Sequence, residues 1–356
     1  MAPPKFHNLK IKSLRRQTEN AVAIGFDVPA SQRSEFSFEP GQYLTLRATV
    51  GGEDIRRSYS ICSACDDEIL EVGIKRVEGG KFSSYAQNLK IGDTVQVMPP
   101  QGRFSAPLGG LHRYLLLATG SGITPCLSIA KSVLEAEIES QITLVYGNKT
   151  ISSVMFLDDL IALKDRYTDR FQIFHTLSRE QSDVDFLNGR LDGSKLHALT
   201  DHKLVDLDTF DAAYICGPQL MAEDLAETLK ELGMVEEAIK TELFLTAGQP
   251  TFIPPAKTAN MNKGSEVSII LDGTQKTVQV DGAQTTVLAA AQQAGLDLPF
   301  SCAGGMCCTC RCKIISGEAV MDVNYSLQDW EVDAGFTLAC QSRPTSKSLT
   351  LDFDAS

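Results

Sequence analysis

The chain has 356 residues with a formal net charge of −12, and apolar residues make up 43% of it. This length predicts two or three globular domains. The acidic balance disfavours a nucleic-acid partner, because phosphates select basic surfaces. The apolar run Tyr114–Ala118 has only five residues, so we expect no membrane span. The start MAPPKF carries no basic and apolar export signal, and we expect a cytoplasmic protein.

Residues 1–108 carry short alternating patterns, such as Tyr43–Arg47 and Leu70–Lys75, which predict an antiparallel β-barrel. Residues 109–245 alternate strands with helices, which predicts βαβ units on a parallel sheet. The predicted strands there are Arg113–Ala118, Ile142–Tyr146, Phe171–Leu177 and Ala212–Cys216, and the predicted helices are Pro125–Glu137, Phe156–Arg166 and a segment ending at Leu232.

A third domain follows a linker. Residues 246–264 contain three prolines and no periodic pattern, which is typical of a linker. Residues 265–356 begin with the predicted strands Val267–Leu271 and Lys276–Val280 and a short predicted helix, Val287–Ala294. A dense group of cysteines then appears.

Four of the ten cysteines have the spacing Cys302-x4-Cys307-x2-Cys310-x29-Cys340. Three thiolates on one loop with a distant fourth are typical of a plant-type 2Fe–2S cluster. A structural zinc site is the alternative, although such sites usually show two close pairs of ligands. We therefore predict that these four cysteines hold a 2Fe–2S cluster.

The other cysteines have simpler interpretations. Within the cluster loop, Gly304 and Gly305 would let the backbone fold tightly and aim amides at the sulfur atoms. Cys308 and Cys312 do not fit the ligand spacing and are interpreted as small residues that flank the loop. Small buried residues are also expected at three further cysteines, namely Cys62, Cys65 and Cys126.

Two motifs in residues 1–108 point to a flavin. Arg57-Ser58-Tyr59-Ser60 matches the R-x-Y-[ST] pattern of the ferredoxin–NADP reductase family. A guanidinium can bind the FAD pyrophosphate, a tyrosine ring can lie against the flavin, and a serine hydroxyl can reach it. An ordinary strand with Tyr59 facing the core is the alternative interpretation.

Downstream, Gly79-Gly80-Lys81-Phe82-Ser83 precedes a helical pattern. The resemblance places Gly80, Lys81 and Ser83 on the FAD phosphates, because amides at a helix start can bind phosphate oxygens. A plain turn with a capping serine is the alternative.

The second predicted domain carries a nucleotide-binding signature. Gly120-Ser121-Gly122-Ile123-Thr124-Pro125 follows an apolar strand and opens a helix. Pro125 departs from the dehydrogenase fingerprint, but GxGxxP is the form that the ferredoxin reductase family carries. We therefore expect Gly120, Gly122, Thr124 and Pro125 to contact the nicotinamide cofactor.

Two further strand ends carry candidate cofactor residues. In the same family the cysteine of a Cys216-Gly217-Pro218 segment lies beside the nicotinamide ring, whereas a small buried residue is the alternative. In NADPH-using members, a pair such as Ser178 and Arg179 holds the 2′-phosphate. A solvated loop arginine is the alternative, and we expect NADPH rather than NADH.

Over nearly its whole length the chain resembles the oxygenase-reductase group of the ferredoxin–NADP reductase superfamily. The resemblance implies an antiparallel β-barrel FAD domain, an α/β nicotinamide domain and a β-grasp plant-type ferredoxin domain. It also implies electron transfer from NADPH through FAD and a 2Fe–2S cluster to a separate diiron oxygenase, the oxygenase component of a multicomponent monooxygenase. Reductases of Rieske or steroid-hydroxylating oxygenases share this architecture, and a redox-sensing module remains a different class of function.

The expected chemistry needs positioning groups rather than a general acid or base. Hydride transfer depends on stacking geometry, and we expect Thr124, Cys216 and Phe244 to provide it. Histidine contributes no candidate metal site, because none of the five shows ligand spacing, namely His7, His112, His175, His197 and His202.

The carboxyl-terminal segment is acidic, with eleven acidic and five basic residues from residue 266 onward. Four acids, Asp322, Asp329, Glu331 and Asp333, lie between the third and fourth predicted cluster ligands. One interpretation is an acidic face that docks on a basic patch of the oxygenase, and the other is a solvated loop.

Overall fold

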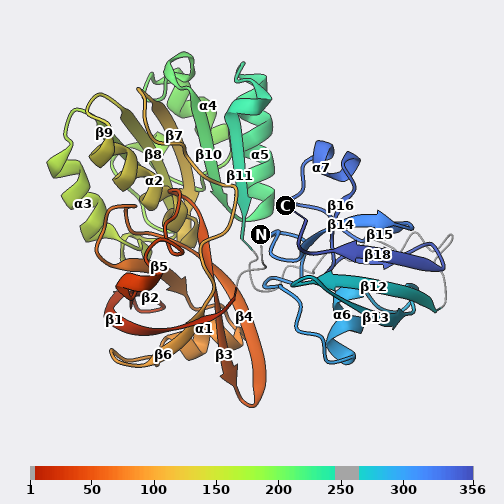
Figure 1. Ribbon diagram of the computed structural model, residues 1–356. Helices are drawn as coiled ribbons and strands as arrows, with labels where there is room; N and C mark the ends of the chain where they lie inside the picture. The colour runs from red at the N-terminus through yellow and green to blue at the C-terminus, as the bar shows by residue number, and fades with distance from the viewer. Residues whose placement is uncertain (1–4, 245–263, 356) are drawn as a thin grey trace. The chain divides into compact units, whose positions relative to one another are not determined.

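The computed structural model describes residues 5–244 and 264–355, and Figure 1 shows its helices and strands. The described residues form two compact units, the first built from residues 8–55 and 59–244 and the second from residues 264–355 together with residues 5–7 and 56–58. Except for Gly264, the predicted linker 246–264 lies outside the described residues. Within the described ranges, no helix combines the length and the apolar character needed to cross a membrane.

An antiparallel sheet forms the first part of the first unit, as the alternating patterns predict. Its elements are β1 (His7–Thr18), β2 (Ala21–Asp27), β3 (Tyr43–Val50), β4 (Glu53–Ser60), β5 (Leu70–Lys75), α1 (Lys81–Ala86) and β6 (Thr94–Val97). The strand order is β4-β3-β6-β1-β2-β5. The chain after β4 closes the sheet into a barrel, because Ile61 pairs with Val72 of β5 and the Cys62 amide donates to the Glu71 carbonyl at 2.9 Å.

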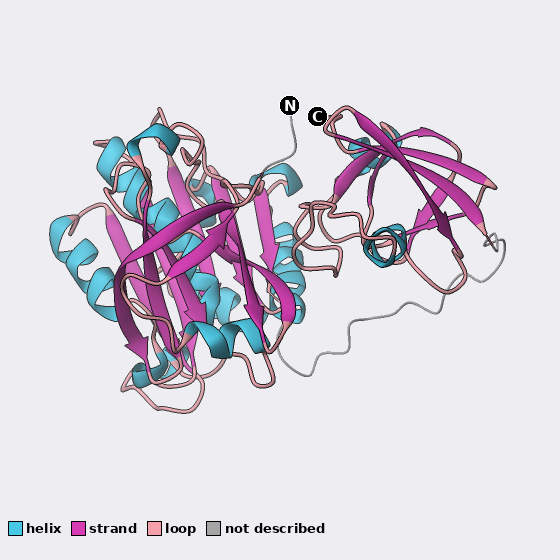
Figure 2. Cartoon of the chain, turned by 60° about the horizontal axis from the view of Figure 1, so that its bottom comes forward, coloured by secondary structure: helices cyan, strands magenta, loops and turns pink. Residues whose placement is uncertain are grey.

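A parallel sheet with helices on its faces forms the rest of this unit (Figure 2). Its elements are β7 (Arg113–Thr119), α2 (Ile123–Ala136), β8 (Gln141–Asn148), α3 (Leu157–Arg166), β9 (Phe171–Leu177), α4 (Gly193–Asp201), β10 (Ala212–Gly217), α5 (Gln219–Glu231) and β11 (Ile239–Leu243). The strand order is β11-β10-β7-β8-β9. Leu116 of β7 packs with residues of α2 and α3, whereas Leu115 and Leu117 pack with residues of α4 and α5. The continuous apolar run of β7 is therefore buried on both faces.

Local charge and capping favour two of these helices. The first turn of α3 carries Asp158 and Asp159, and its last turn carries Lys164 and Arg166. Acids at the amino-terminal end and bases at the carboxyl-terminal end both interact favourably with the helix dipole. At the start of α4, the Asp192 side chain accepts a hydrogen bond from a first-turn amide, which satisfies one otherwise unpaired donor.

The second unit has the β-grasp arrangement that the ferredoxin resemblance implies. Its elements are β12 (Ser265–Leu271), β13 (Thr274–Val280), α6 (Val287–Gln293), β14 (Arg311–Ser316), β15 (Ala319–Met321), α7 (Asp329–Asp333), β16 (Phe336–Leu338), β17 (Ser342–Pro344) and β18 (Ser348–Asp352). The main sheet has the order β13-β12-β18-β14-β16, in which β12 is antiparallel to β13 and parallel to β18. Val287, Leu288 and Ala291 of α6 join the core of this sheet. The expected three-part fold is confirmed.

A network of charged side chains connects the barrel to the helices of the parallel sheet. Arg15 of β1 donates to Glu71 at 2.7 Å and to Asp159 of α3 at 3.0 Å, and Lys131 of α2 donates to Asp159 at 3.1 Å. Burial alone would raise the pKa of Asp159, but the two cations outweigh it and the pKa is lowered. Asp159 therefore stays ionised at neutral pH and ties the two parts together.

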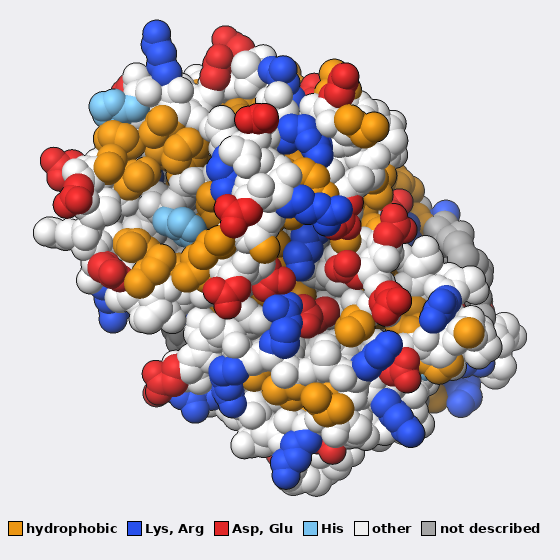
Figure 3. Space-filling model, turned by 90° about the vertical axis from the view of Figure 1, so that its left-hand side faces the viewer, with side chains coloured by type: hydrophobic (Ala, Val, Ile, Leu, Met, Phe, Trp, Pro, Cys, Tyr) orange, Lys and Arg blue, Asp and Glu red, His pale blue; other side chains and the backbone are white. Residues whose placement is uncertain are grey.

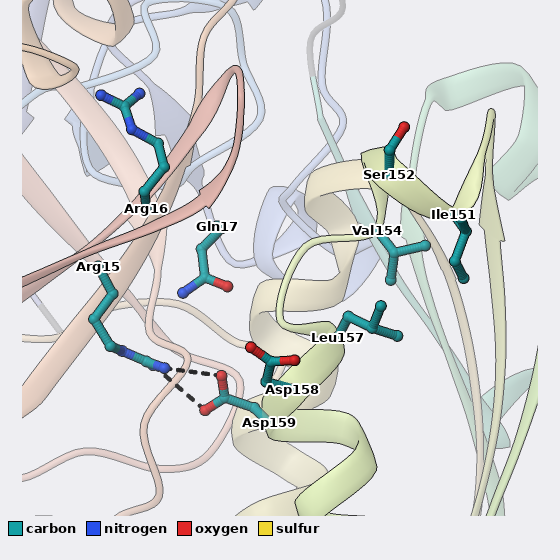
Figure 4. Close-up of a pocket in the computed structure, with 9 residues that line it drawn as sticks. All are labelled: Arg15, Arg16, Gln17, Ile151, Ser152, Val154, Leu157, Asp158 and Asp159. Carbon is teal, nitrogen blue, oxygen red and sulfur yellow. Dashed lines mark hydrogen bonds and ion pairs between the residues drawn. The ribbon is translucent and has the colours of Figure 1, made fainter.

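A cavity of about 330 Å³ lies beside this network (Figure 4). Its lining comes from β1 and from the segment around the start of α3, and consists of Arg15, Arg16, Gln17, Ile151, Ser152, Val154, Leu157, Asp158 and Asp159. Arg15 points toward Asp159, whereas Arg16 points away from it (Figure 4). On this side of the molecule, basic and acidic side chains are interspersed (Figure 3).

Candidate functional site

The predicted nucleotide-binding turn lies against the end of β10. Gly120–Gly122 forms a short helical turn between β7 and α2, and Gly120 has a positive φ of 55°. A Cβ atom on Gly122 would lie 2.1 Å from the carbonyl oxygen of Cys216. Only glycine fits this contact, so the structure brings the GxGxxP and Cys-Gly-Pro motifs together.

Side chains from three different strands, including Cys216 itself, meet at the end of β10. Register in the sheet places Cys216 of β10 opposite Glu242 of β11. The Glu242 Oε2 atom accepts a hydrogen bond from Ser60 Oγ of β4 at 3.1 Å and one from Cys216 Sγ at 3.8 Å. A residue of the predicted flavin motif thus shares a carboxylate with a residue of the predicted nicotinamide motif. Glu242 is not predictable from the sequence, because nothing in the local pattern TELF distinguishes this acid.

Cys216 is a thiol rather than a thiolate in this setting. Its side chain is fully buried. Burial, reinforced by the negative charge of Glu242, raises the pKa of Cys216 well above its ordinary value. A protonated thiol is a weak nucleophile. The geometry therefore fits a residue that packs and orients a ring.

The other two predicted positioning residues lie nearby. Thr124 of α2 is buried, and its hydroxyl donates to the Ser121 carbonyl at 2.9 Å. A Cβ atom on Gly73 of the barrel strand β5 would lie 2.5 Å from the Thr124 methyl group, so the barrel touches α2 here. The Phe244 amide donates to the Gly217 carbonyl at 2.9 Å. Pro125 is buried in the first turn of α2, and Pro218 precedes α5.

The carboxyl edge of the parallel sheet has buried polar groups that need a partner. Thr119 Oγ1 and Thr176 Oγ1 have no hydrogen-bond partner within the part of the chain that the structure describes. A Cβ atom on Gly147 would lie 2.9 Å from the Thr119 methyl group and 3.2 Å from the Thr176 hydroxyl, so the two threonines flank Gly147. Buried hydroxyls are normally bonded. A polar ligand at the edge where dinucleotides bind in such sheets would satisfy them.

Cations collect at the same edge. Lys75 ends β5, and a Cβ atom on Gly120 would lie 3.5 Å from its ammonium nitrogen. Burial, together with the charge of Lys149, lowers the pKa of Lys75. Arg179 is exposed after β9, with its amide bonded to the Lys149 carbonyl at 2.8 Å, and Ser178 is exposed beside it. The arrangement suits a phosphate-bearing ligand. Neither lysine belongs to a motif that the sequence shows.

The two predicted flavin segments are neighbours in the barrel. Tyr59 of β4 and Phe82 of α1 have ring centroids 5.6 Å apart. Arg57 is exposed, Ser58 and Tyr59 are half-buried, and Ser60 is buried.

In the second flavin segment, Gly80 caps α1. The Ser83 hydroxyl accepts from the Val77 amide at 3.1 Å, and Lys81 forms an ion pair with Glu53 at 2.6 Å. The side chains of Lys81 and Ser83 thus have protein partners, and their contact with FAD phosphates stays a prediction.

The structure brings the four predicted cluster ligands together in the second unit. Cys302 interacts with Cys307, and Cys310 interacts with Cys340, so the four thiols form two pairs. A 2Fe–2S cluster has two irons, each of which takes two thiolates. The paired arrangement therefore fits this cluster.

Backbone amides of the ligand loop point at sulfur. The amides of Gly304 and Met306 donate to Cys302 Sγ at 3.3 and 3.4 Å. Gly305 has a positive φ of 78°, and Ala303 and Cys308 also take positive φ values of 50° and 52°. Non-glycine residues adopt this conformation only where the surroundings impose it. The loop shape fits a cradle for sulfide atoms.

The two extra cysteines of this region are not part of the thiol pairs. Cys308 Sγ donates to the Ser326 carbonyl at 3.3 Å, and Cys312 is fully buried in β14. Cys62 and Cys126 are fully buried as well, whereas Cys65 is half-exposed and donates to the Phe38 carbonyl at 3.3 Å.

Comparison with known proteins agrees with this arrangement. Family models described as an oxidoreductase FAD-binding domain, an oxidoreductase NAD-binding domain and a 2Fe-2S iron-sulfur cluster binding domain match residues 8–106, 116–227 and 269–345. The chain is 41% identical to one of the subunits of 1,2-phenylacetyl-CoA epoxidase from Escherichia coli K12, with 98% of both chains covered. The chain belongs to the family of FAD- and 2Fe–2S-containing oxygenase reductases. The family expected from the sequence is thus confirmed, and the reductase binds FAD, a nicotinamide cofactor and a 2Fe–2S cluster.

More distant relatives share the same organisation. The reductase is 30% identical to the ferredoxin reductase component of 3-ketosteroid-9-alpha-monooxygenase from Rhodococcus rhodochrous, over 97% of this chain and 96% of that one. The solved structure of phthalate dioxygenase reductase matches with a TM-score of 0.59 and 26% identity over 98% of both chains. An intact type IV self-sufficient cytochrome P450 monooxygenase shares the fold at a TM-score of 0.69 and 22% identity, and the reductase spans 41% of its length.

Replacing Cys340 with serine should remove most of the cluster from the reductase, because losing one of four thiolates leaves an iron open to solvent. Iron analysis and the visible absorption spectrum measure the loss. NADPH-to-ferricyanide activity should largely survive, because ferricyanide can take electrons from FAD. Cys308→Ser is the matched control and should keep its cluster. A normal cluster in the Cys340 variant would show that the fourth ligand is another residue.

Replacing Glu242 with alanine should slow the reduction of bound FAD by NADPH roughly tenfold or more, because Ser60 and Cys216 lose the acceptor that orients them. Stopped-flow absorbance of the flavin measures this rate. Glu242→Gln keeps an acceptor oxygen, so its rate of flavin reduction should lie between those of the wild type and the alanine variant. Glu237→Gln, an exposed change before the same strand, is the control. An unchanged rate in the alanine variant would refute the role of this carboxylate.

Proposed function

We propose that this reductase serves a multicomponent oxygenase of the phenylacetyl-CoA epoxidase kind. In this proposal electrons pass from NADPH to FAD, then to the 2Fe–2S cluster, and then to a separate diiron oxygenase. The observation that carries the assignment is 41% identity to the epoxidase component from Escherichia coli across 98% of both chains. The site supports it, because Ser60 of the flavin motif and Cys216 of the nicotinamide motif share the Glu242 carboxylate.

When bound, FAD supplies the change from two-electron to one-electron transfer, since it exchanges an electron pair with a nicotinamide and single electrons with an iron–sulfur cluster. The contribution of the protein is to position the two cofactors against each other. Arg57, Tyr59 and Ser60 present the flavin, while Thr124, Cys216 and Phe244 place the nicotinamide ring against it. Lys75 and Lys149 supply positive charge for the phosphates of the nucleotide.

The remaining assignments belong to the same proposal. The domain bounds are residues 1–108 for the FAD barrel, 109–245 for the nicotinamide domain, 246–264 for the linker and 265–356 for the ferredoxin domain. Gly80, Lys81 and Ser83 approach the FAD phosphates. The working compartment is the cytoplasm, where all ten cysteines, each free of a disulfide, would stay reduced.

A second candidate is the reductase of a steroid-hydroxylating oxygenase, which the 30% identity to the 3-ketosteroid-9-alpha-monooxygenase component favours. Purified reductase mixed with NADPH and the oxygenase components of either system separates the two. We expect product from phenylacetyl-CoA with the epoxidase components and much slower turnover with the steroid system. Turnover only with the steroid oxygenase would reverse the assignment.

Arg179→Ala should raise KM for NADPH by about one to two decades while leaving KM for NADH nearly unchanged. The reason is that the 2′-phosphate occurs only in NADPH, and a charge-assisted hydrogen bond to it would be lost. Steady-state ferricyanide reduction with each nucleotide measures both constants. Glu180 follows Arg179 and accepts from the Ile151 amide at 2.8 Å, so Glu180→Ala is a control for disturbance of the loop. Equal changes for both nucleotides would mean that Arg179 does not contact the phosphate.

A further inference from the structure

The second unit exposes large apolar side chains around its cluster loop. Trp330, the one tryptophan of the chain, is 59% exposed, and Val332 on the same short helix is 39% exposed. Tyr325, in the loop before this helix, is 36% exposed. The indole N–H of Trp330 is bonded to the Gln328 side chain at 2.5 Å, so the ring keeps its apolar faces in water. Single exposed apolar residues are common, but these three occur within eight residues of one another, and this segment is called the patch below.

The helix that carries this patch is fixed next to a cluster ligand. Glu331 of α7 is fully buried and accepts a hydrogen bond from Arg311 at 2.9 Å. Arg311 directly follows the ligand Cys310, and its guanidinium lies 3.5 Å from the centroid of the Phe336 ring. Glu331 also completes a capping box at the start of α7. The hydrogen bonds of Glu331 therefore fix the helix that carries Trp330.

Tyr325 lies directly against the ligand loop. Its amide donates to the Gly305 carbonyl at 3.1 Å, and the Ser326 hydroxyl donates to the same oxygen at 3.0 Å. Cys308 of the ligand loop in turn donates to the Ser326 carbonyl at 3.3 Å. A protein that binds to Tyr325 and Trp330 would therefore lie close to the loop that carries the cluster ligands.

The structure changes the interpretation of the acidic residues that lie between the third and fourth predicted cluster ligands. Glu331 is buried against Arg311, and Asp322 accepts two hydrogen bonds of 2.8 Å from Arg343. These two carboxylates are neutralised within the unit and cannot attract a distant partner. Asp329 directly precedes Trp330 and Asp333 follows it by about one helical turn, and both are exposed. The patch is thus an aromatic centre with an acidic border.

We propose that Trp330, bordered by Asp329 and Asp333, anchors the ferredoxin unit on the electron-accepting oxygenase. The inference rests on the proposed function. A buried aromatic anchor within a polar rim is the usual energetic centre of a protein interface. The expected partner surface is an apolar pocket edged by lysine or arginine side chains, which matches the acidic border and the net charge of −6 from residue 266 onward.

The test measures steady-state reduction of the oxygenase by NADPH with full-length reductase. We expect Trp330→Ala to raise KM for the oxygenase at least tenfold, Trp330→Phe to raise it less, and Ile315→Ala to leave it unchanged. Ile315 is the control because it is 54% exposed on β14 of the same unit. Iron content and ferricyanide reduction should stay normal in all three variants, which excludes loss of the fold.

Other outcomes separate the possible failures. If wild-type reductase does not reduce the oxygenase at all, the proposed function fails. If wild type does and Trp330→Ala matches it, the docking proposal is overturned. Stopped-flow transfer from flavin to cluster in the absence of oxygenase should be unaffected by the substitution. A slowed internal transfer would mean that the patch meets the flavin unit of the same chain, which also overturns the proposal.

Discussion

The backbone of Gly122 lies against the carbonyl oxygen of Cys216 with no room for a side chain between them. This contact sets the distance between the turn after β7 and the end of β10. Register then places Glu242 beside Cys216, and the packing of Thr124 on Gly73 brings the barrel to the same point. The segments predicted to bind the flavin and the nicotinamide are therefore brought together by a backbone contact, by strand register and by one side-chain methyl group. A site fixed in this way suits chemistry governed by the stacking of two rings.

The second unit follows a different principle. Its site is a loop whose shape is strained at Ala303 and Cys308, and whose amides point at sulfur atoms. Such strain persists only where the surrounding structure imposes it. The core below α6 and the bonds from Ser326 to the loop provide this support. The two units thus separate the tasks of accepting an electron pair and of delivering single electrons.

Local patterns predicted much of the fold. The strands Leu70–Lys75 and Phe171–Leu177 match β5 and β9 to the residue. Nearly all of β5 is buried, which gives it a clear apolar pattern, whereas only Phe171 and Thr176 of the edge strand β9 are buried. The cysteine spacing likewise selects four thiols that the structure brings together in pairs, and their role as cluster ligands stays a prediction. Glu242 could not be predicted, since its importance depends on the pairing of β10 with β11 across distant segments. The burial of Glu331 was hidden for the same reason, because its partner Arg311 is twenty residues away.

The buried thiols of the first unit have a consequence for chemical durability. Burial raises the pKa of Cys62, Cys126 and Cys216, and all three side chains are fully enclosed. Peroxide and alkylating agents attack thiolates that they can reach, so these sulfurs are poor targets. A flavoprotein that handles electrons in air is exposed to reduced oxygen species as a by-product of its own work. In the proposed site, the enclosure of Cys216 would let a sulfur atom lie beside the reacting rings without becoming the first group to be oxidised.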